Sequence, residues 1–164
     1  MKHRIQILAV LSGLLVAAVG LSMIGVNAAD EGAAERRTKA DKTFNDGNFK
    51  DAYAIYRDLL LDADAAQPQD AATAVNALNR LDRVDEIDAL LEAAVEKHPT
   101  NWAMLEAIAT QFRNTQHYGF IVAGEFQRGR HRGGGRYANS FKRDRARGLQ
   151  LLEQARLLLE EDDT

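Results

Sequence analysis

Apolar side chains recur at helical spacing in six segments of the chain, with polar side chains on the opposite sides. The segments are residues 35–45, 48–63, 69–81, 83–97, 101–114 and 143–160. Short polar connections separate them, and Gly47, Pro68 and Pro99 in these connections are residues that end helices. The chain has only two prolines, so long stretches are free to be helical. This pattern predicts an all-α protein.

The helical segments also repeat one another. Ala52, Ile87 and Gly148 lie at equivalent positions, separated by 35 and then 61 residues. The first interval fits one ordinary pair of helices, and the second fits one pair with about 27 residues inserted. We therefore expect a solenoid of about three antiparallel helix pairs, with an insert at about 116–141.

Several residues in this frame resemble the tetratricopeptide repeat. The matching positions are Gly47, Phe49, Ala52 and Tyr56 in the first pair, and Leu91, Ala94 and Pro99 in the second. The departures are Asp82 where glycine is usual, Ile87 where alanine is usual, and Asp64 where proline is usual. The resemblance implies stacked pairs with a concave face. A plain helical bundle uses the same apolar stripes and stays open as the alternative.

A second resemblance covers residues 117–126, HYGFIVAGEF, and continues through Arg128 to Ser140. This string is similar to the N-terminal region of large secreted bacterial alpha-2-macroglobulin-like proteins, and residues 84–89, VDEIDA, add to the likeness. The family's thioester needs a cysteine, and the chain has none. The resemblance therefore implies the leading helical part of such a protein, in an exported setting, without inhibitory activity of its own.

The N-terminus indicates export. Basic residues at 2–4 precede an apolar run over 5–26, and small residues follow at 26–29. This pattern is typical of a signal peptide over residues 1–29, cleaved after Ala28 or Ala29. An uncleaved anchor stays open because the run is long enough to cross a bilayer, and residues 5–26 would then be the only membrane contact. Either case leaves 30–164 as one exported domain, whether periplasmic, in the cell envelope or secreted.

Charge divides the exported part into an acidic body and a basic insert. Residues 30–115 hold 10 basic and 17 acidic side chains, whereas 116–147 hold 8 and 2. Glycines space the arginines of the insert, so we expect a flexible loop whose guanidinium groups bind anionic groups in pairs. The candidate ligand-binding residues of this loop are Arg128, Arg130, Arg132, Arg136 and Tyr137.

Two alternatives for the insert stay open. The loop is either solvated without a specific role, or Arg128 or Arg136 folds back onto the acidic helices of this chain. If the loop binds a ligand, export favours an anionic envelope polymer over nucleic acid.

The first helix of each pair would line the concave face. Outward positions there that suit the backbone of a bound peptide are Arg37, Asn76, Asn79, Arg80 and Arg113. We therefore expect a protein or peptide as the partner of this face.

Nothing in the sequence indicates an enzyme. The absence of cysteine removes thiolate zinc sites and cysteine nucleophiles, and we find no nucleophile elbow or phosphate-binding glycine loop. We expect no catalytic residue, no cofactor and no metal. The sequence predicts an exported protein–protein interaction module, with an envelope-tethering element that binds anionic polymer or lipid as the alternative.

Overall fold

The computed structural model describes residues 24–162, and this part of the chain is mostly helical. The elements are α1 (Ile24–Asn45), α2 (Phe49–Leu60), α3 (Pro68–Arg80), the 3-10 turn η1 (Val84–Glu86), α4 (Ile87–Lys97), α5 (Trp102–Asn114), β1 (Tyr118–Val122), β2 (Glu125–Arg128), β3 (Arg136–Asn139) and α6 (Phe141–Asp162). The five helices predicted after residue 47 are confirmed, with ends that differ by a few residues.

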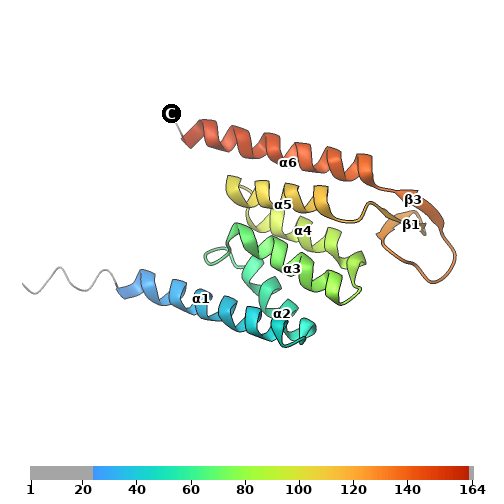
Figure 1. The fold of residues 1–164 in the computed structure, drawn as a ribbon. Helices are drawn as coiled ribbons and strands as arrows, with labels where there is room; N and C mark the ends of the chain where they lie inside the picture. Colours follow the sequence, from blue (N-terminus) through green and yellow to red (C-terminus); the bar gives the residue numbers. More distant parts are fainter. Residues whose placement is uncertain (1–23, 163–164) are drawn as a thin grey trace, which may run out of the picture.

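The helices pack side by side, and each contacts the one before it along the chain. Figure 1 shows them arranged from α1 on one side to α6 on the other, with the strands beside the ends of α5 and α6. The most extensive helix contacts join α5 to α6, α1 to α2, α2 to α3, and α3 to α5. Polar contacts connect the end of α4 to α2 and to α6. His98 Nε2 is 2.7 Å from the carbonyl oxygen of Leu60, the last residue of α2. Gln154 of α6 donates to the carbonyl oxygen of Pro99 at 2.8 Å.

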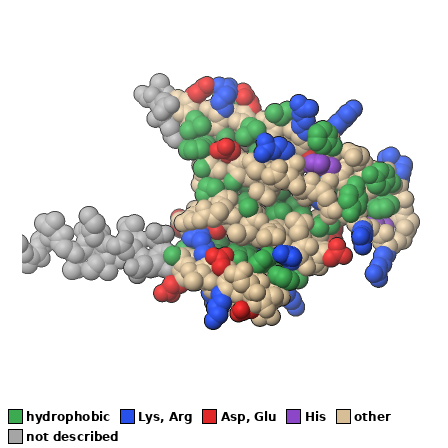
Figure 2. Space-filling view, in the orientation of Figure 1, with side chains coloured by type: hydrophobic (Ala, Val, Ile, Leu, Met, Phe, Trp, Pro, Cys, Tyr) green, Lys and Arg blue, Asp and Glu red, His purple; other side chains and the backbone are tan. Residues whose placement is uncertain are grey.

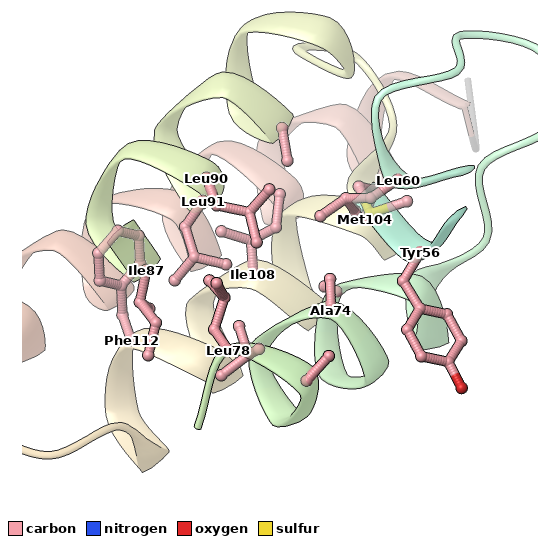
Figure 3. Close-up of a cluster of buried hydrophobic side chains, with 14 of the residues drawn as sticks. Tyr56, Leu60, Ala74, Leu78, Ile87, Leu90, Leu91, Met104, Ile108 and Phe112 are labelled. Atoms are coloured by element: carbon pink, nitrogen blue, oxygen red, sulfur yellow. The ribbon is translucent and has the colours of Figure 1, made fainter. Parts of the chain in front are cut away.

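A single hydrophobic core runs through the pairs (Figure 3). Its fully buried side chains include Leu60, Leu78, Leu91, Met104 and Ile108. Each such side chain contributes about 1.5–3 kcal/mol relative to an exposed one. The apolar stripes predicted for the segments 69–81, 83–97 and 101–114 face inward. In the last helix only part of the predicted stripe does: Ala155 is buried, whereas Leu149, Leu152 and Leu159 are exposed.

Small residues mark the closest helix crossings. Ala52 and Ala94 are completely buried. Gly148 lies so close to α5 that an added Cβ would be 3.3 Å from the carbonyl oxygen of Ala109. A larger side chain at these positions would push the helices apart.

The turns after α1 and α3 have the same backbone geometry. Gly47 and Asp82 both adopt a positive φ, of 85° and 57°. In each turn the next residue donates a backbone hydrogen bond of 3.0 Å to the residue five positions earlier, Asn48 to Thr43 and Arg83 to Leu78. These are Schellman caps, which satisfy the carbonyl groups at a helix end. They lie 35 residues apart.

The segment between α5 and α6 is not the loop that we expected from the sequence. It contains a three-stranded antiparallel sheet in the order β2-β1-β3. Ala123 and Gly124 both have positive φ, which makes the two-residue turn that joins β1 to β2 with the twist a hairpin needs. The fold is therefore not purely α-helical, and only residues 129–135 of the basic segment form a loop.

The first helix begins earlier than predicted. We expected an irregular start up to residue 34, whereas α1 begins at Ile24, and Ala33 is already buried. Alanine, glutamate and arginine dominate 28–40, and these residues favour helix. Most of the predicted signal or anchor segment lies outside the described residues. Within 24–162, no helix is both long and apolar enough for a bilayer span.

The left-handed turn at Gly47 generates a stability prediction. Gly47→Ala should destabilise the protein by about 1 kcal/mol, because a Cβ is unfavourable at positive φ, although nothing lies within 4 Å of that Cβ. Gly32→Ala is the matched control, since Gly32 lies inside α1 with equally open surroundings. It should stabilise by about 0.5–1 kcal/mol. Urea denaturation followed by circular dichroism measures both, and equal effects would contradict the assignment.

Candidate functional site

The most deeply buried charge of the insert is Arg128, at the end of β2, with a relative exposure of 1%. Its guanidinium donates to Asp144 of α6 through Nη1 at 2.9 Å and Nη2 at 3.0 Å. It also donates to Asp88 of α4 through Nε at 3.0 Å and Nη2 at 2.5 Å. Arg128 therefore joins the sheet to two different helices.

Further polar groups complete this arrangement. Arg128 Nη1 donates to the carbonyl oxygen of Gln116, and Ser140 Oγ donates to Asp144 at 2.7 Å. Arg143 donates to both carboxylates, at 2.6 Å to Asp88 and 2.8 Å to Asp144. Two arginines thus balance two aspartates. We call Asp88, Arg128, Arg143 and Asp144 the charge clasp.

The clasp determines the protonation of Asp144. Burial by itself would raise the pKa of this carboxyl, but hydrogen bonds from Arg128, His117, Ser140 and Arg143 outweigh it. The pKa therefore lies well below its usual value of 3.8, and Asp144 stays ionised in any neutral or mildly acidic medium. A buried ion pair offsets its desolvation only where the geometry is good and the remaining hydrogen bonds are satisfied, as they are around Asp144.

An aromatic ring shields the clasp. The guanidinium carbons of Arg143 and Arg128 lie 4.3 Å and 5.6 Å from the centre of the Phe126 ring, within cation–π distance. His117 adds a contact from the α5–β1 connection, with Nδ1 2.8 Å from Asp144 Oδ2. Asp144 of the clasp thus binds both ends of the insert, through His117 and Ser140, and its middle, through Arg128.

The strand register places the clasp and a second group of residues on opposite faces of the sheet. Side chains of directly paired residues share a face, and neighbours along a strand alternate. Gly119 pairs with Arg128, and Ile121 pairs with Phe126, on the face toward the helices. Phe120 pairs with Tyr137 on the other face, where the two rings meet edge to face at 6.1 Å.

This outer face forms an open depression of about 740 Å³. Its lining residues are Asp82, Tyr118, Phe120, Arg130, His131, Arg132 and Tyr137. The connection from β2 to β3 has to pass across β1, because β1 lies between them. The loop 129–135 therefore crosses near the aromatic face, and the ring of His131 lies 6.2 Å from that of Phe120. We call this surface the aromatic–arginine depression.

Figure 2 shows the same combination of apolar and basic side chains where the sheet lies: Lys and Arg side chains surround a group of hydrophobic side chains. Tyr137 is 60% exposed, and the loop arginines Arg130 and Arg132 are also exposed. An exposed aromatic ring beside guanidinium groups suits a ligand that carries both negative charge and apolar surface.

The structure divides the five predicted residues of the insert. Arg130, Arg132 and Tyr137 come together in the aromatic–arginine depression. The expectation that Arg128 belongs to a ligand-binding loop is wrong, because it is buried by its own acidic partners; the alternative in which it folds back is confirmed. Arg136 is exposed but pairs with Ile121, which puts it on the face opposite to Tyr137.

The five predicted residues of the helices have different roles. Arg37 donates to Asp70 at 3.0 Å and 2.7 Å and so connects α1 to the start of α3. Arg80 lies 5.7 Å from the Phe49 ring and covers the α1–α2 turn. Asn76, Asn79 and Arg113 are exposed on α3 and α5. Arg37 therefore holds two helices together, whereas the side chains of Asn76, Asn79 and Arg113 face solvent.

Sequence reasoning missed Asp88 and Asp144 as partners of Arg128, and it missed Tyr118, Phe120 and His131 as lining residues. The short aromatic and β-branched run over residues 118–122, followed by the Ala123-Gly124 turn, was the available signal for strands. The acidic partners carry no such signal, because they come from helices 40 and 16 residues away.

No protein-family model, curated protein or solved structure matches this chain. Within residues 24–162 no group of three or more histidine, aspartate or glutamate side chains is arranged to hold a metal ion. The aromatic rings and guanidinium groups that line the depression suit stacking, charge pairing and hydrogen bonding.

The clasp generates a first prediction for this site. Arg128→Met should destabilise the protein by about 3 kcal/mol or more, since buried Asp144 loses its two-pronged partner and the exposed Arg143 remains the only guanidinium beside it. Arg136→Met is the matched control, because Arg136 is exposed, and its effect should stay within about 0.5 kcal/mol. Chemical denaturation measures both, and a loss below about 1 kcal/mol for Arg128→Met would contradict a stabilising clasp.

A second prediction concerns acid. A carboxyl with a lowered pKa in the folded state contributes stability above its unfolded pKa, here 3.8, and this contribution is lost as the pH falls below that value. The free energy of unfolding should therefore decrease steeply in acid, and Asp144→Asn should make the decrease shallower while lowering stability at neutral pH. Denaturation at a series of pH values tests this, and parallel curves for the two proteins would disprove it.

Proposed function

We propose that this chain is an exported protein–protein interaction module, built from tetratricopeptide-type helix pairs, that contacts its partner through the aromatic–arginine depression. The observation that carries the proposal is the charge clasp beneath the sheet. It holds a small, mostly solvent-facing platform firmly in place, although the platform adds little to the hydrophobic core. Rigid support under exposed aromatic and arginine side chains is what a binding surface needs.

The repeat type has support in the two Schellman turns. Asp82 adopts a φ of 57° at the position where a tetratricopeptide repeat usually has glycine, which is the residue suited to that conformation. Gly47 occupies the equivalent position one interval earlier. Buried Ala52 and Ala94 fit the small-residue positions of such a repeat, while Ile87, buried where alanine is usual, is accommodated by the core.

The composition of the depression favours a protein partner. Tyrosine, phenylalanine and arginine are enriched at the centres of protein interfaces, where a few of them carry most of the binding free energy. Tyr137 offers a large exposed ring, and Arg130 and Arg132 offer charge beside it. We infer a partner segment that combines acidic with apolar side chains.

The proposed family setting is the leading part of an alpha-2-macroglobulin-like protein. The strings that resemble that family meet in the fold. β2, which begins inside the string 117–126, contacts η1 of the string 84–89, and an added Cβ at Gly129, just after β2, would lie 2.2 Å from Val84 Cγ2. They thus belong to one structural unit at the sheet end. We transfer the exported setting from this resemblance and no protease-trapping activity.

Envelope tethering is the second candidate. It is favoured by the two exposed arginines of the 129–135 loop, which suit phosphate or sulfate groups on a polymer or lipid. Salt separates the two functions, because binding to a polyanion weakens steeply with ionic strength, whereas stacking on Tyr137 does not.

A peptide selection tests the proposal. A random peptide library displayed on phage should yield acidic, apolar-containing peptides that bind the protein. Tyr137→Ala should weaken their binding about tenfold or more, as for an interface hot spot. Arg130→Ala combined with Arg132→Ala should weaken it as well, with the loss greatest at low salt.

The matched control removes two exposed cations from α1 and α2, Lys39→Ala with Lys50→Ala, and should leave peptide binding unchanged. Phosphatidylglycerol vesicles serve as the competing probe. Two results together would overturn the proposal in favour of tethering. The protein would bind the vesicles at low salt and lose this binding at high salt, and Tyr137→Ala would leave the affinity for the selected peptides unchanged.

A further inference from the structure

The sheet has one open edge, along β3. The strand order is β2-β1-β3, so β2 and β3 are the two edge strands. β2 also contacts η1, whereas within residues 24–162 only β1 is in extensive contact with β3. Three of the four residues of β3 are exposed, Arg136, Tyr137 and Asn139. The outer edge of β3 is therefore accessible to a further strand.

The strand register identifies the backbone groups that lie along this edge. In an antiparallel pair, alternate residues direct both N–H and C=O toward the neighbouring strand. The backbone N–H of Ser140 donates to the carbonyl oxygen of His117 at 2.8 Å, one step beyond the pair of Tyr118 and Asn139. Tyr137 and Asn139 therefore direct their backbone groups away from β1, and no strand in the described part of the chain pairs with them. An extended segment can satisfy such an edge by adding a strand.

The side chains beside the edge specify which segment fits. A strand added next to β3 would place every second side chain on the face of Tyr137 and the others on the opposite face, with Arg136. The exposed Tyr137 ring favours an apolar neighbour, and Arg136 favours a carboxylate. Arg130 and Arg132 line the depression with Tyr137 and add positive charge there, against Asp82 as the only acidic lining residue. The edge thus suits an acidic segment with apolar residues at alternate positions.

We propose that an acidic segment of the protein partner binds as a fourth strand beside β3, with acidic and apolar residues in alternation. The inference rests on the proposed function, and it specifies the backbone conformation and the sequence pattern of the bound segment. A second copy of this chain fits less well, because two β3 strands side by side would bring the exposed arginines of both copies close together. An arginine on an edge strand also discourages pairing with uncharged strands.

Two capped peptides of equal composition test the pairing on the full chain. In the first peptide, glutamates alternate with valines and one central tyrosine. In the second, the same residues form one acidic block and one apolar block. Fluorescence anisotropy should show about tenfold tighter binding of the alternating peptide, because only that peptide presents apolar side chains to Tyr137 and carboxylates to Arg136 at once. Equal affinities for the two peptides overturn the proposal.

Methylation of the peptide backbone tests for the strand itself. A methyl group on an amide nitrogen removes the hydrogen-bond donor and blocks the close approach of a neighbouring strand. Alternate residues of a strand direct their N–H groups to the same side, so methylation should weaken binding about tenfold at every second central residue and little at the residues between. A series of affinities without this alternation overturns the proposal.

A matched pair of protein variants tests the edge from the other side. Asn139→Pro removes a backbone N–H of the open edge and leaves the bonds between β1 and β3 in place, since proline is tolerated on edge strands where the N–H faces outward. Asn139→Ala removes the same side chain and keeps the N–H. Asn139→Pro should bind the alternating peptide about tenfold more weakly than Asn139→Ala, with thermal unfolding as the check that both are folded. Equal binding by the two folded variants contradicts the pairing.

The strand pairing and the proposed function can fail separately. Peptide binding that is lost in Tyr137→Ala but shows no alternation on methylation overturns the pairing and keeps the depression as the contact surface. Alternation without any loss in Tyr137→Ala supports the pairing and contradicts the role of the depression. A dimer of the protein in size-exclusion chromatography that Asn139→Pro dissociates would identify a second copy as the occupant and overturn the acidic partner.

Discussion

The arrangement of this protein depends on one arginine held between carboxylates of two helices. Arg128 leaves a strand of the insert and pairs with Asp88 of α4 and Asp144 of α6. An unpaired charge in that position would cost several kcal/mol, so the strands, α4 and α6 are constrained to one relative placement. The same constraint orients the outer face of the sheet, because the residues of that face alternate with those of the clasp.

Much of the helical framework follows from the sequence by elementary rules. Apolar periodicity gave the helices after residue 47 with small errors at their ends, because packing stripes must recur every three to four residues. The interval of 35 residues from Gly47 to Asp82 has a counterpart in two turns of the same backbone geometry. Aspartate at the second turn weakens the sequence signal without changing the conformation, since aspartate tolerates positive φ better than most residues.

The insert was predicted less well, for a physical reason. Its glycines and arginines indicate flexibility when considered locally, but the order of this segment comes from charges elsewhere in the chain. Asp88 is 40 residues from Arg128, and no periodicity along the sequence connects them. Arg130, Arg132 and Tyr137 were recognised as a group from composition alone, whereas Phe120 required knowledge of the strand register. Sequence patterns thus picked out the exposed aromatic and arginine side chains of this segment and missed the scaffold that presents them.

The two ends of the insert meet at a single point. The backbone N–H of Ser140 donates to the carbonyl oxygen of His117 at 2.8 Å, so the chain leaves α5 and returns to α6 through adjacent residues. The excursion thus begins and ends at one place on the helical framework, the arrangement in which insertions are tolerated at exposed connections. This junction is consequently a grafting point for a foreign hairpin or a different recognition element, on the condition that the graft supplies a cation in the place of Arg128 or that Asp88 and Asp144 are exchanged with it.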